Sequence, residues 1–375
     1  MPHVPSIPST QRAWVATRKG LFELRRTADA GIAAGGWRIA NVSFLGDPVT
    51  MVLPPDAQGR MLAALNLGHF GCKVHASDDA GATWREVATP TYPAQPPDAP
   101  GFEWKLKLIW SLARSMSGHG EPVLWAGTLP GGLFRSADLG ESWQLVESLW
   151  HRPERLEWAG GGYPEPGIHS ICPYPGRPDE LLVGISSGGA WVTRDGGQDW
   201  QVQCRGMRAD FMPPEQAENP NMQDPHSIVR CPAQPEVLWC QHHGGIWRST
   251  DNAGSWQPLQ AAPSSFGFVV AVHPQEADTA WFVPAVKDER RIPVDGALCV
   301  TRTRDGGQSF EALRHGLPQS DCYDLVYRHG LDVAADGRSL LMASTTGNLW
   351  ASHDGGDHWQ LVNAHLPPVY AVHFG

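Results

Sequence analysis

The sequence predicts an all-β fold, a seven-bladed β-propeller that forms one domain over residues 1–375. Three observations support this prediction. A turn motif repeats at the spacing of one blade, short strand-like runs lie between glycine and proline turns, and the two ends of the chain carry strands that lack partners in their own blade.

The repeated motif is S-x-D-x-G-x-x-W, and its first copy spans residues 77–84. Further copies or near-copies begin at Ser136, Thr193, Thr303 and Ser352, and a variant begins at Ser249 with Ala253 in the glycine position. Successive starts are 49 to 59 residues apart, which matches one four-stranded blade with variable loops. A period of this length indicates a propeller or a solenoid.

The aspartates of the motif are predicted to be structural. Each carboxylate can accept hydrogen bonds from its own turn, the glycine supplies a positive φ, and the tryptophan is buried between blades. We expect every turn to connect the third and fourth strands of its blade, and the turn at Ser249 to be distorted by Ala253. The six aspartates are Asp79, Asp138, Asp195, Asp251, Asp305 and Asp354.

The first blade lacks an innermost strand. Residues 14–16, 20–24 and 36–39 are predicted as its second, third and fourth strands, with a degenerate turn around Thr27 and Asp29. Residues 368–374 follow the last motif and are predicted as the missing innermost strand. The C-terminal strand would then join the N-terminal blade and close the ring, which removes both sheet edges.

Between the ends, each blade is predicted to contain an innermost strand, a turn that often contains proline, a second strand and a glycine-marked hairpin. The connections at residues 86–104, 144–167 and 201–224 are much longer than usual. We expect them to fold over one face, because they contain Trp104, Trp150, Trp158, Tyr163, Phe211 and Met212.

Composition excludes several functions. The net charge of −10 opposes binding to nucleic acid or to an anionic membrane. The seven cysteines are scattered without a C-x-x-C pair, which is typical of reduced thiols. With no secretory signal at the N-terminus and no apolar stretch of membrane-spanning length, a cytoplasmic location is predicted.

The face opposite the motif turns is the predicted binding face, because the innermost strands begin there. Aligning these strands places one residue of each blade at the channel mouth: Val49, Trp110, His169, His226, Phe268, Tyr323 and Tyr370. Hairpins on the same face add His69 and the pair His242 and His243. An aromatic surface with a few polar groups is typical of small-ligand sites. The predicted ligand-binding residues are Trp110, Trp158, His169, His226, His242, Tyr323 and Tyr370.

Several imidazoles at one mouth could hold a divalent metal, for which His169, His226 and His242 are the candidate ligands. The alternative is that each histidine only hydrogen-bonds neighbouring backbone. No other cofactor is predicted.

Carboxylates on the long loops allow an enzymatic alternative, for which Glu157 and Asp224 are the candidate catalytic residues. A glycosidase needs two such groups about 5–10 Å apart. The alternative is that each is a solvated loop charge. The basic run at residues 287–291 could likewise contact a substrate carboxylate or phosphate, or form a surface charge cluster.

Residues 17–22, 68–71 and 131–136, together with the motif series, resemble bacterial BNR/Asp-box repeat proteins of the YVTN/WD40-like type, often labelled glycosyl hydrolase or exo-α-sialidase. The resemblance covers nearly the whole chain and implies a seven-bladed propeller whose motif turns lie away from a catalytic face. A sialidase would need an arginine triad, and the innermost strands are expected to supply no arginine at the ring. Xyloglucanase-like enzymes pair two such propellers, and photosystem assembly-factor propellers act as protein chaperones.

We therefore predict a propeller that binds a small molecule or carbohydrate, a sugar or carboxylated metabolite, at the channel mouth. A protein partner and a glycoside hydrolase-like activity are the alternatives.

Overall fold

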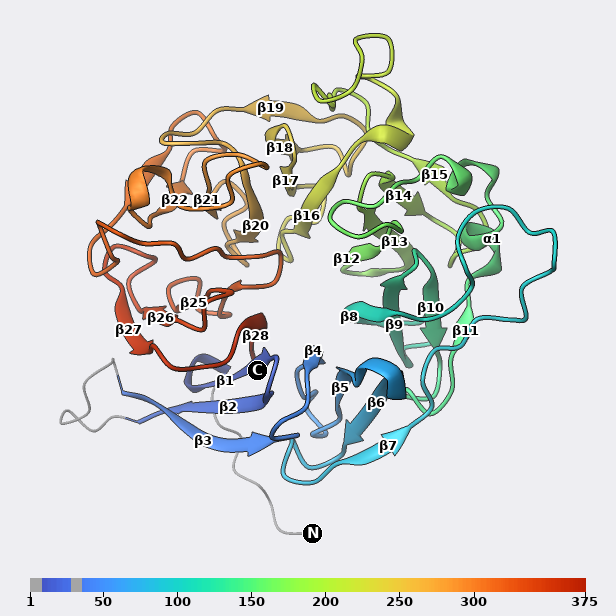
Figure 1. Ribbon diagram of the computed structural model, residues 1–375, viewed down its shortest axis with the longest axis horizontal. Coiled ribbons are helices and arrows are strands. Elements are labelled where there is room, and N and C mark those ends of the chain that lie inside the picture. Colours follow the sequence, from blue (N-terminus) through green and yellow to red (C-terminus); the bar gives the residue numbers. More distant parts are fainter. Residues whose placement is uncertain (1–8, 28–35) are drawn as a thin grey trace.

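Seven four-stranded antiparallel sheets surround a central axis (Figure 1). The structure is a computed structural model that describes residues 9–27 and 36–375. The innermost strand of each blade lies next to the axis and the fourth strand lies at the rim. The predicted seven-bladed, all-β fold is confirmed.

The strands of blades 1 to 4 follow, each listed from the axis outward. Blade 1 contains β28 (Val369–Phe374), β1 (Arg12–Thr17), β2 (Gly20–Arg26) and β3 (Trp37–Ser43). Blade 2 contains β4 (Val49–Leu53), β5 (Met61–Asn66), β6 (Cys72–Ser77) and β7 (Arg85–Val87). Blade 3 contains β8 (Leu108–Met116), β9 (Pro122–Leu129), β10 (Leu133–Ser136) and β11 (Gln144–Leu145). Blade 4 contains β12 (Ile168–Tyr174), β13 (Arg177–Ile185), β14 (Gly189–Thr193) and β15 (Gln201–Val202).

Blades 5 to 7 have the same order. Blade 5 contains β16 (Pro225–Arg230), β17 (Leu238–His242), β18 (Gly245–Ser249) and β19 (Gln257–Leu259). Blade 6 contains β20 (Gly267–Val272), β21 (Ala280–Pro284), β22 (Val300–Thr303) and β23 (Glu311–Leu313). Blade 7 contains β24 (Leu331–Val333), β25 (Leu340–Ala343), β26 (Leu349–Ser352) and β27 (Gln360–Asn363).

Short helices occupy the connections: η1 (Ser9–Gln11), η2 (Gly68–Phe70), α1 (Glu147–Trp150), η3 (Pro153–Leu156), η4 (Pro220–Met222) and η5 (Val294–Gly296). In the described ranges, none of the helices has the length and apolar character that crossing a bilayer requires. The long connections between β7 and β8 and between β15 and β16 project beyond the rim in Figure 1.

The ring closes as predicted. β28 pairs antiparallel with β1, with Val372 opposite Val15 and Ala371 opposite Ala16. Blade 1 is therefore built from the two ends of the chain, and the strand edge of β1 that faces the axis is covered. Thr27, at the start of the expected degenerate turn, donates its N–H to Gly36 at 2.9 Å, whereas Asp29 lies outside the described residues.

The repeated turns connect third and fourth strands, and their side chains bond to their own backbone. In the first turn, Ser77 Oγ accepts from the N–H of Gly81 at 2.8 Å, and Asp79 Oδ1 accepts from the N–H of Thr83 at 2.8 Å. The turn at Ser249 has the same bonds, from Ala253 to Ser249 Oγ at 2.9 Å and from Ser255 to Asp251 Oδ1 at 2.8 Å. The predicted distortion of this turn is wrong, because Ala253 adopts the required positive φ of 65° despite its Cβ.

Tryptophans fill the spaces between neighbouring blades. Trp14, Trp191, Trp239, Trp281 and Trp350 lie on strands and are at most 2% exposed. Trp239 Nε1 donates to the Ala277 carbonyl at 2.9 Å and Trp281 Nε1 donates to the Gly355 carbonyl at 2.8 Å, each on the following blade. The indoles thus combine apolar burial with a hydrogen bond that fixes one blade against the next.

Removing residues 369–375 should prevent cooperative folding. The deletion exposes the edge of β1 and removes the buried side chains of Val369, Ala371, Val372 and Phe374. Burial of a large apolar side chain contributes about 1.5–3 kcal/mol, so the loss approaches a typical total stability of about 5–15 kcal/mol. Thermal melts followed by circular dichroism should show no sharp transition, and a synthetic peptide of residues 366–375 should restore it. A truncated chain that melts like the full chain would contradict ring closure as the source of stability.

Acid should destabilise the propeller through its motif aspartates. The hydroxyl and N–H groups of Ser309 donate to Asp305 and lower its pKa to about 2, below the value of about 3.9 in an unfolded chain. A lowered folded-state pKa stabilises the protein above about pH 4, and this contribution is lost as the pH falls towards 2. Calorimetry should show a falling unfolding midpoint over this range, with a smaller fall in Asp305→Asn. A midpoint that does not change between about pH 5 and 3 would contradict this account.

Candidate site at the channel mouth

Bulges in the innermost strands direct side chains towards the axis. In β8, Ile109 pairs with Thr128 and Ser111 with Gly127, so Trp110 is left unpaired between them. The same irregularity leaves Thr50, His169, His226 and Tyr370 unpaired in their strands, and Phe268 lies within the irregular part of β20. Bulges often re-aim side chains next to functional sites. These are the positions that the alignment of innermost strands selected, except in blade 2, where Thr50 is unpaired in place of the buried Val49.

Blade 7 departs from this pattern. Its innermost strand β24 begins only at Leu331, and Tyr323 lies upstream of it and is 64% exposed. Placing Tyr323 at the mouth is therefore wrong. The segment Tyr327 to Gly330, which we call the plug, takes that position: His329 Nε2–H donates to the carbonyl of His169 in blade 4 at 2.8 Å. Because blades 4 and 7 lie across the ring from each other, the plug spans the channel.

The plug separates two cavities. Arg328 and His329 line both of them. The larger one, the mouth cavity, has a volume of about 720 Å³ and the smaller one about 330 Å³. The mouth cavity is lined by five Phe, Trp and Tyr side chains and two arginines, namely Phe70, Trp110, Tyr163, Tyr327, Tyr370, Arg291 and Arg328, with Thr50, Asn66 and Asp47 among the other polar groups. Its size and mixed lining are typical of small-molecule sites.

Arg328 is the most unusual group in the mouth cavity. It is 8% exposed, and its Nε and Nη2 are buried without a hydrogen-bond partner among the described residues. Its guanidinium carbon lies 4.8 Å from the ring centroid of Trp110 and 5.8 Å from that of Phe268. Burial lowers the pKa of Arg328, which Asp224 partly offsets. A buried guanidinium is costly unless it is paired, and Arg328 lines the mouth cavity, so an anion bound there would compensate its charge.

Arg291 adds a second cation on the same side. It lies 5.2 Å from the ring centroid of Phe268, and its side chain contacts Asp288 and the hydroxyl of Tyr327. The basic run 287–291 was expected either to contact a substrate anion or to form a surface charge cluster. Arg291, the last residue of the run, lines the mouth cavity. Arg291 is paired with Asp288, so Arg328 is the lining arginine whose Nε and Nη2 have no hydrogen-bond partner among the described residues.

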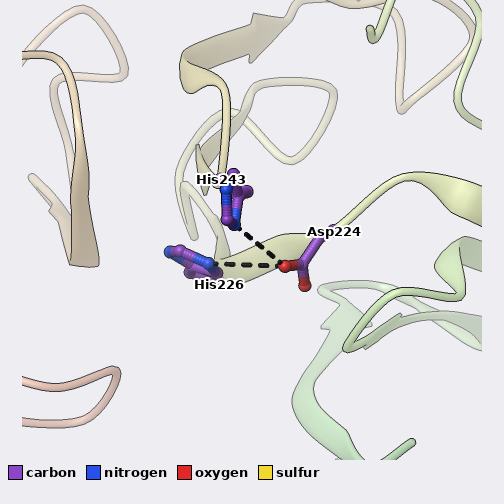
Figure 2. Close-up of side chains that lie close together, drawn as sticks. All are labelled: Asp224, His226 and His243. Carbon is purple, nitrogen blue, oxygen red and sulfur yellow. Dashed lines mark ion pairs between the residues drawn. The ribbon is translucent and has the colours of Figure 1, made fainter. Parts of the chain in front are cut away.

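Asp224, His226 and His243 form a compact cluster beside the mouth cavity (Figure 2). Asp224 Oδ2 lies 3.6 Å from His226 Nε2 and 3.4 Å from His243 Nδ1. His226 stacks on Phe268 with ring centroids 4.6 Å apart, which connects the cluster to the arginines. Burial by itself raises the pKa of Asp224, but the neighbouring His226 and His243, with a contribution from the charge of Arg328, lower it below its usual value.

The structure divides the predicted histidine set. His242 is fully buried, and both of its ring nitrogens face backbone N–H groups, those of Asp224 at 3.0 Å and Gly244 at 2.9 Å. His169 is 1% exposed and lines the smaller cavity, with Nδ1 2.9 Å from Ser170 Oγ. Grouping His169, His226 and His242 as metal ligands is therefore wrong, because only His226 belongs to the compact cluster.

Two other predicted residues lie away from the mouth cavity. Trp158 is 2% exposed and packs against Trp191 at 5.6 Å, so it belongs to the core and offers no surface to a ligand. Glu157 is exposed on the surface, where Oε2 accepts from Asn221 Nδ2 at 2.9 Å. Neither Glu157 nor Asp224 lines the mouth cavity, whose one carboxylate among the described residues is Asp47.

Sequence reasoning missed Arg328 and the plug. Aligning the innermost strands by their downstream turns placed Tyr323 at the mouth, and Arg328 escaped notice because it lies in the plug, before the innermost strand β24 begins at Leu331. A signal was present in Tyr327-Arg328-His329-Gly330, where a charged residue and a glycine precede a short apolar strand. Gly330 tolerates no side chain there, because a Cβ would lie 2.7 Å from the Ala343 carbonyl oxygen.

The sequence matches no protein-family model and no curated protein. Among solved structures it is similar to an ancestral GH74 enzyme, with 16% identity and a TM-score of 0.57 over 84% of this chain. It is also similar to YCF48 from Cyanidioschyzon merolae, with 15% identity and a TM-score of 0.52 over 85% of this chain and 87% of that one. The structure of YCF48 bound to D1 peptide is 15% identical, with a TM-score of 0.51 over 92% of this chain and 88% of that one.

These similarities show the fold, since the GH74 enzymes and YCF48 are also seven-bladed β-propellers. The chain spans 37% of the length of the ancestral GH74 enzyme. The fold and the mouth cavity thus define a seven-bladed propeller with a plugged channel. The result agrees with the resemblance to BNR-type and WD40-like propellers.

Arg328→Met should not destabilise the protein, although it removes a buried charged side chain. Nε and Nη2 have no hydrogen bond to lose among residues 9–27 and 36–375, and the desolvation cost of the charge disappears, so the free energy of unfolding should stay constant or rise by about 1–2 kcal/mol. Arg302→Met is the matched control. Arg302 is 2% exposed and bonds to Glu311, Asp357 and the Gly355 carbonyl, so its loss should cost about 1–3 kcal/mol. Urea titration measures the free energy of unfolding of both variants. If Arg328→Met destabilises the protein as much as Arg302→Met does, Arg328 has a structural partner.

Proposed function

We propose that the protein binds a small molecule carrying a carboxylate or a similar anionic group in the mouth cavity. The observation that carries this proposal is Arg328, which is buried beside the cavity with hydrogen-bond donors that no described residue uses. Selection rarely retains a buried cation without a partner, because its desolvation is costly. A carboxylate that accepts two parallel N–H···O bonds would compensate that cost.

The remaining lining favours a ligand with a flat or apolar body. Trp110 and Tyr163 meet edge to face at 5.6 Å, and Phe70, Tyr327 and Tyr370 complete the aromatic part of the cavity. Rings of this kind bind sugar faces and apolar groups, while Thr50 and Asn66 can orient hydroxyl groups. Carboxylated metabolites and acidic sugars have this combination.

Glycoside hydrolysis is the weaker candidate. A glycosidase requires two carboxylates facing the same bond, and the described lining of the mouth cavity contains Asp47 alone. The similarity to the GH74 enzyme concerns the fold at 16% identity and does not supply that pair. We therefore favour a binding module over a hydrolase.

A thermal-shift screen of carboxylated metabolites, uronic acids and their uncharged amide or methyl-ester analogues tests the proposal, with calorimetric titration of any hit. Acids should raise the unfolding midpoint of the wild type and their neutral analogues should not. Arg328→Met and Trp110→Ala should weaken binding of the best acid by at least about tenfold, which is the loss of one charge-assisted contact or one ring contact.

Two variants serve as controls. Arg304→Met removes an exposed arginine on the motif side, and Tyr323→Phe alters the exposed tyrosine outside the cavity, so neither should change the affinity. A peptide with a free C-terminal carboxylate is included because one structural neighbour is peptide-bound. If neutral analogues bind as well as acids, or if Arg328→Met binds like the wild type, the proposal is wrong.

A further inference from the structure

We propose that Asp224, His226 and His243 bind a divalent transition-metal ion. The cluster is separate from the donors of Arg328 and consists of two imidazoles and one carboxylate, a ligand set typical of zinc and non-haem iron sites. The proposal stands on the positions of the three side chains and does not depend on the proposed function.

The separations of the ligand atoms fit a shared metal ion. The three atoms lie within 4.8 Å of one another, with Asp224 Oδ2 3.6 Å from His226 Nε2 and 3.4 Å from His243 Nδ1. Both distances are too long for a good hydrogen bond. Two ligands of a tetrahedral zinc ion, each about 2.0–2.1 Å from the metal, lie about 3.3 Å apart. The two separations from Asp224 Oδ2 are close to that value, and the imidazole nitrogens of His226 and His243 lie within 4.8 Å of each other.

The tautomer of His226 also favours metal binding. His226 Nδ1 lies 2.6 Å from the Gly267 carbonyl oxygen, which can only accept, so Nδ1 carries a proton. In the neutral ring Nε2 then presents a lone pair towards the Asp224 carboxylate (Figure 2). Two lone pairs facing each other in a buried site repel unless a cation lies between them. A histidine that donates one N–H to a backbone carbonyl while its other nitrogen binds the metal is the usual arrangement.

The other two ligands are also held in place by outer contacts. Asp224 Oδ1 accepts from the N–H of Ser187 at 3.0 Å, which leaves Oδ2 to face the imidazoles. The N–H of His243 donates to the Asp224 carbonyl at 2.9 Å, and its ring packs against Phe211 at 4.6 Å. All three side chains are therefore oriented before any metal arrives, as metal sites require.

Charge balance adds a further argument. Asp224 is 4% exposed, and its ion pairs among the described residues are with His226 and His243 alone. A buried carboxylate needs a cationic partner. His226 is 2% exposed, and Phe268 stacks on its ring, so a second proton on this imidazole would be poorly solvated. Arg328 lies close enough for its charge to act on Asp224, and a metal ion bound by the three side chains would add positive charge at the carboxylate itself.

Three protein ligands leave at least one coordination position for water or a ligand atom, as in zinc sites that bind exogenous molecules. Gly161, which lines the mouth cavity, lies so close to Asp224 that a Cβ on it would be 3.1 Å from Oδ1. The metal would therefore lie beside the cavity.

Zinc titration of the full chain tests the site. Protein stripped with EDTA and dialysed into metal-free buffer is titrated with Zn²⁺ by calorimetry, and Co²⁺ gives an independent optical readout of the coordination. The wild type should bind one zinc ion per chain. His243→Ala and Asp224→Asn should each weaken binding by at least about tenfold. The side-chain amide introduced by Asp224→Asn still offers an oxygen to the N–H of Ser187, so the loop contact is kept.

The control is His358→Ala, which removes an exposed pair formed by His315 and His358 with ring centroids 4.4 Å apart. This variant should bind zinc like the wild type. Circular dichroism confirms that each variant is folded, and His243 is the preferred target because its side chain is 24% exposed. A wild type that binds no zinc would overturn the proposal. Unchanged affinity in both cluster variants, or loss of binding in His358→Ala, would also overturn it.

Discussion

The pairing of β28 with β1 is the constraint on which the rest of the structure depends. It joins the last strand of the chain to the first and converts a row of seven sheets into a closed ring. Once the ring is closed, the innermost strands converge on one axis, and side chains far apart in the sequence meet there. His329 bonding to the carbonyl of His169, 160 residues away, is a direct result.

The closed ring also makes a buried charge tolerable at the axis. Tryptophan layers and the repeated turns hold the blades rigidly, so the plug can retain Arg328 between Trp110 and Phe268 without a hydrogen bond to Nε or Nη2. The guanidinium of Arg328 therefore keeps N–H donors that no described residue uses. Strain and unpaired polar groups that survive in a stable fold are often found at binding sites.

The fold was readable from the sequence because it repeats. The six motif turns and the unpaired strand at residues 368–374 determine the blade number and the closure, and local turn chemistry determines where each third strand ends. Trp110, His169 and His226 were placed on the axis side for the same reason. The turn at Ser249 shows the limit of residue preference, since Ala253 adopts a conformation that glycine favours.

The site was only partly readable, because it depends on departures from the repeat. The plug replaces the start of the innermost strand in blade 7, so alignment with the other blades selected Tyr323 in place of Arg328. Hydrogen-bond partners distinguish His242, whose ring nitrogens face backbone N–H groups, from His226, and burial removes Trp158 from the mouth cavity. A linear pattern of aromatic and imidazole residues cannot reveal either difference. The contact of Asp224 with His243 arises from the hairpin between β17 and β18, whose side-chain directions a strand register does not give.

The central proposal is that Arg328, whose Nε and Nη2 have no hydrogen-bond partner in the described part of the chain, binds an anion at the mouth cavity. A crystal structure with bromoacetate, located by the anomalous scattering of bromine, tests this claim most directly. The account predicts a bromine peak in the mouth cavity with the carboxylate facing the guanidinium of Arg328. Bromine found only on the outer surface, together with a protein group hydrogen-bonded to Arg328 Nε and Nη2, would contradict it.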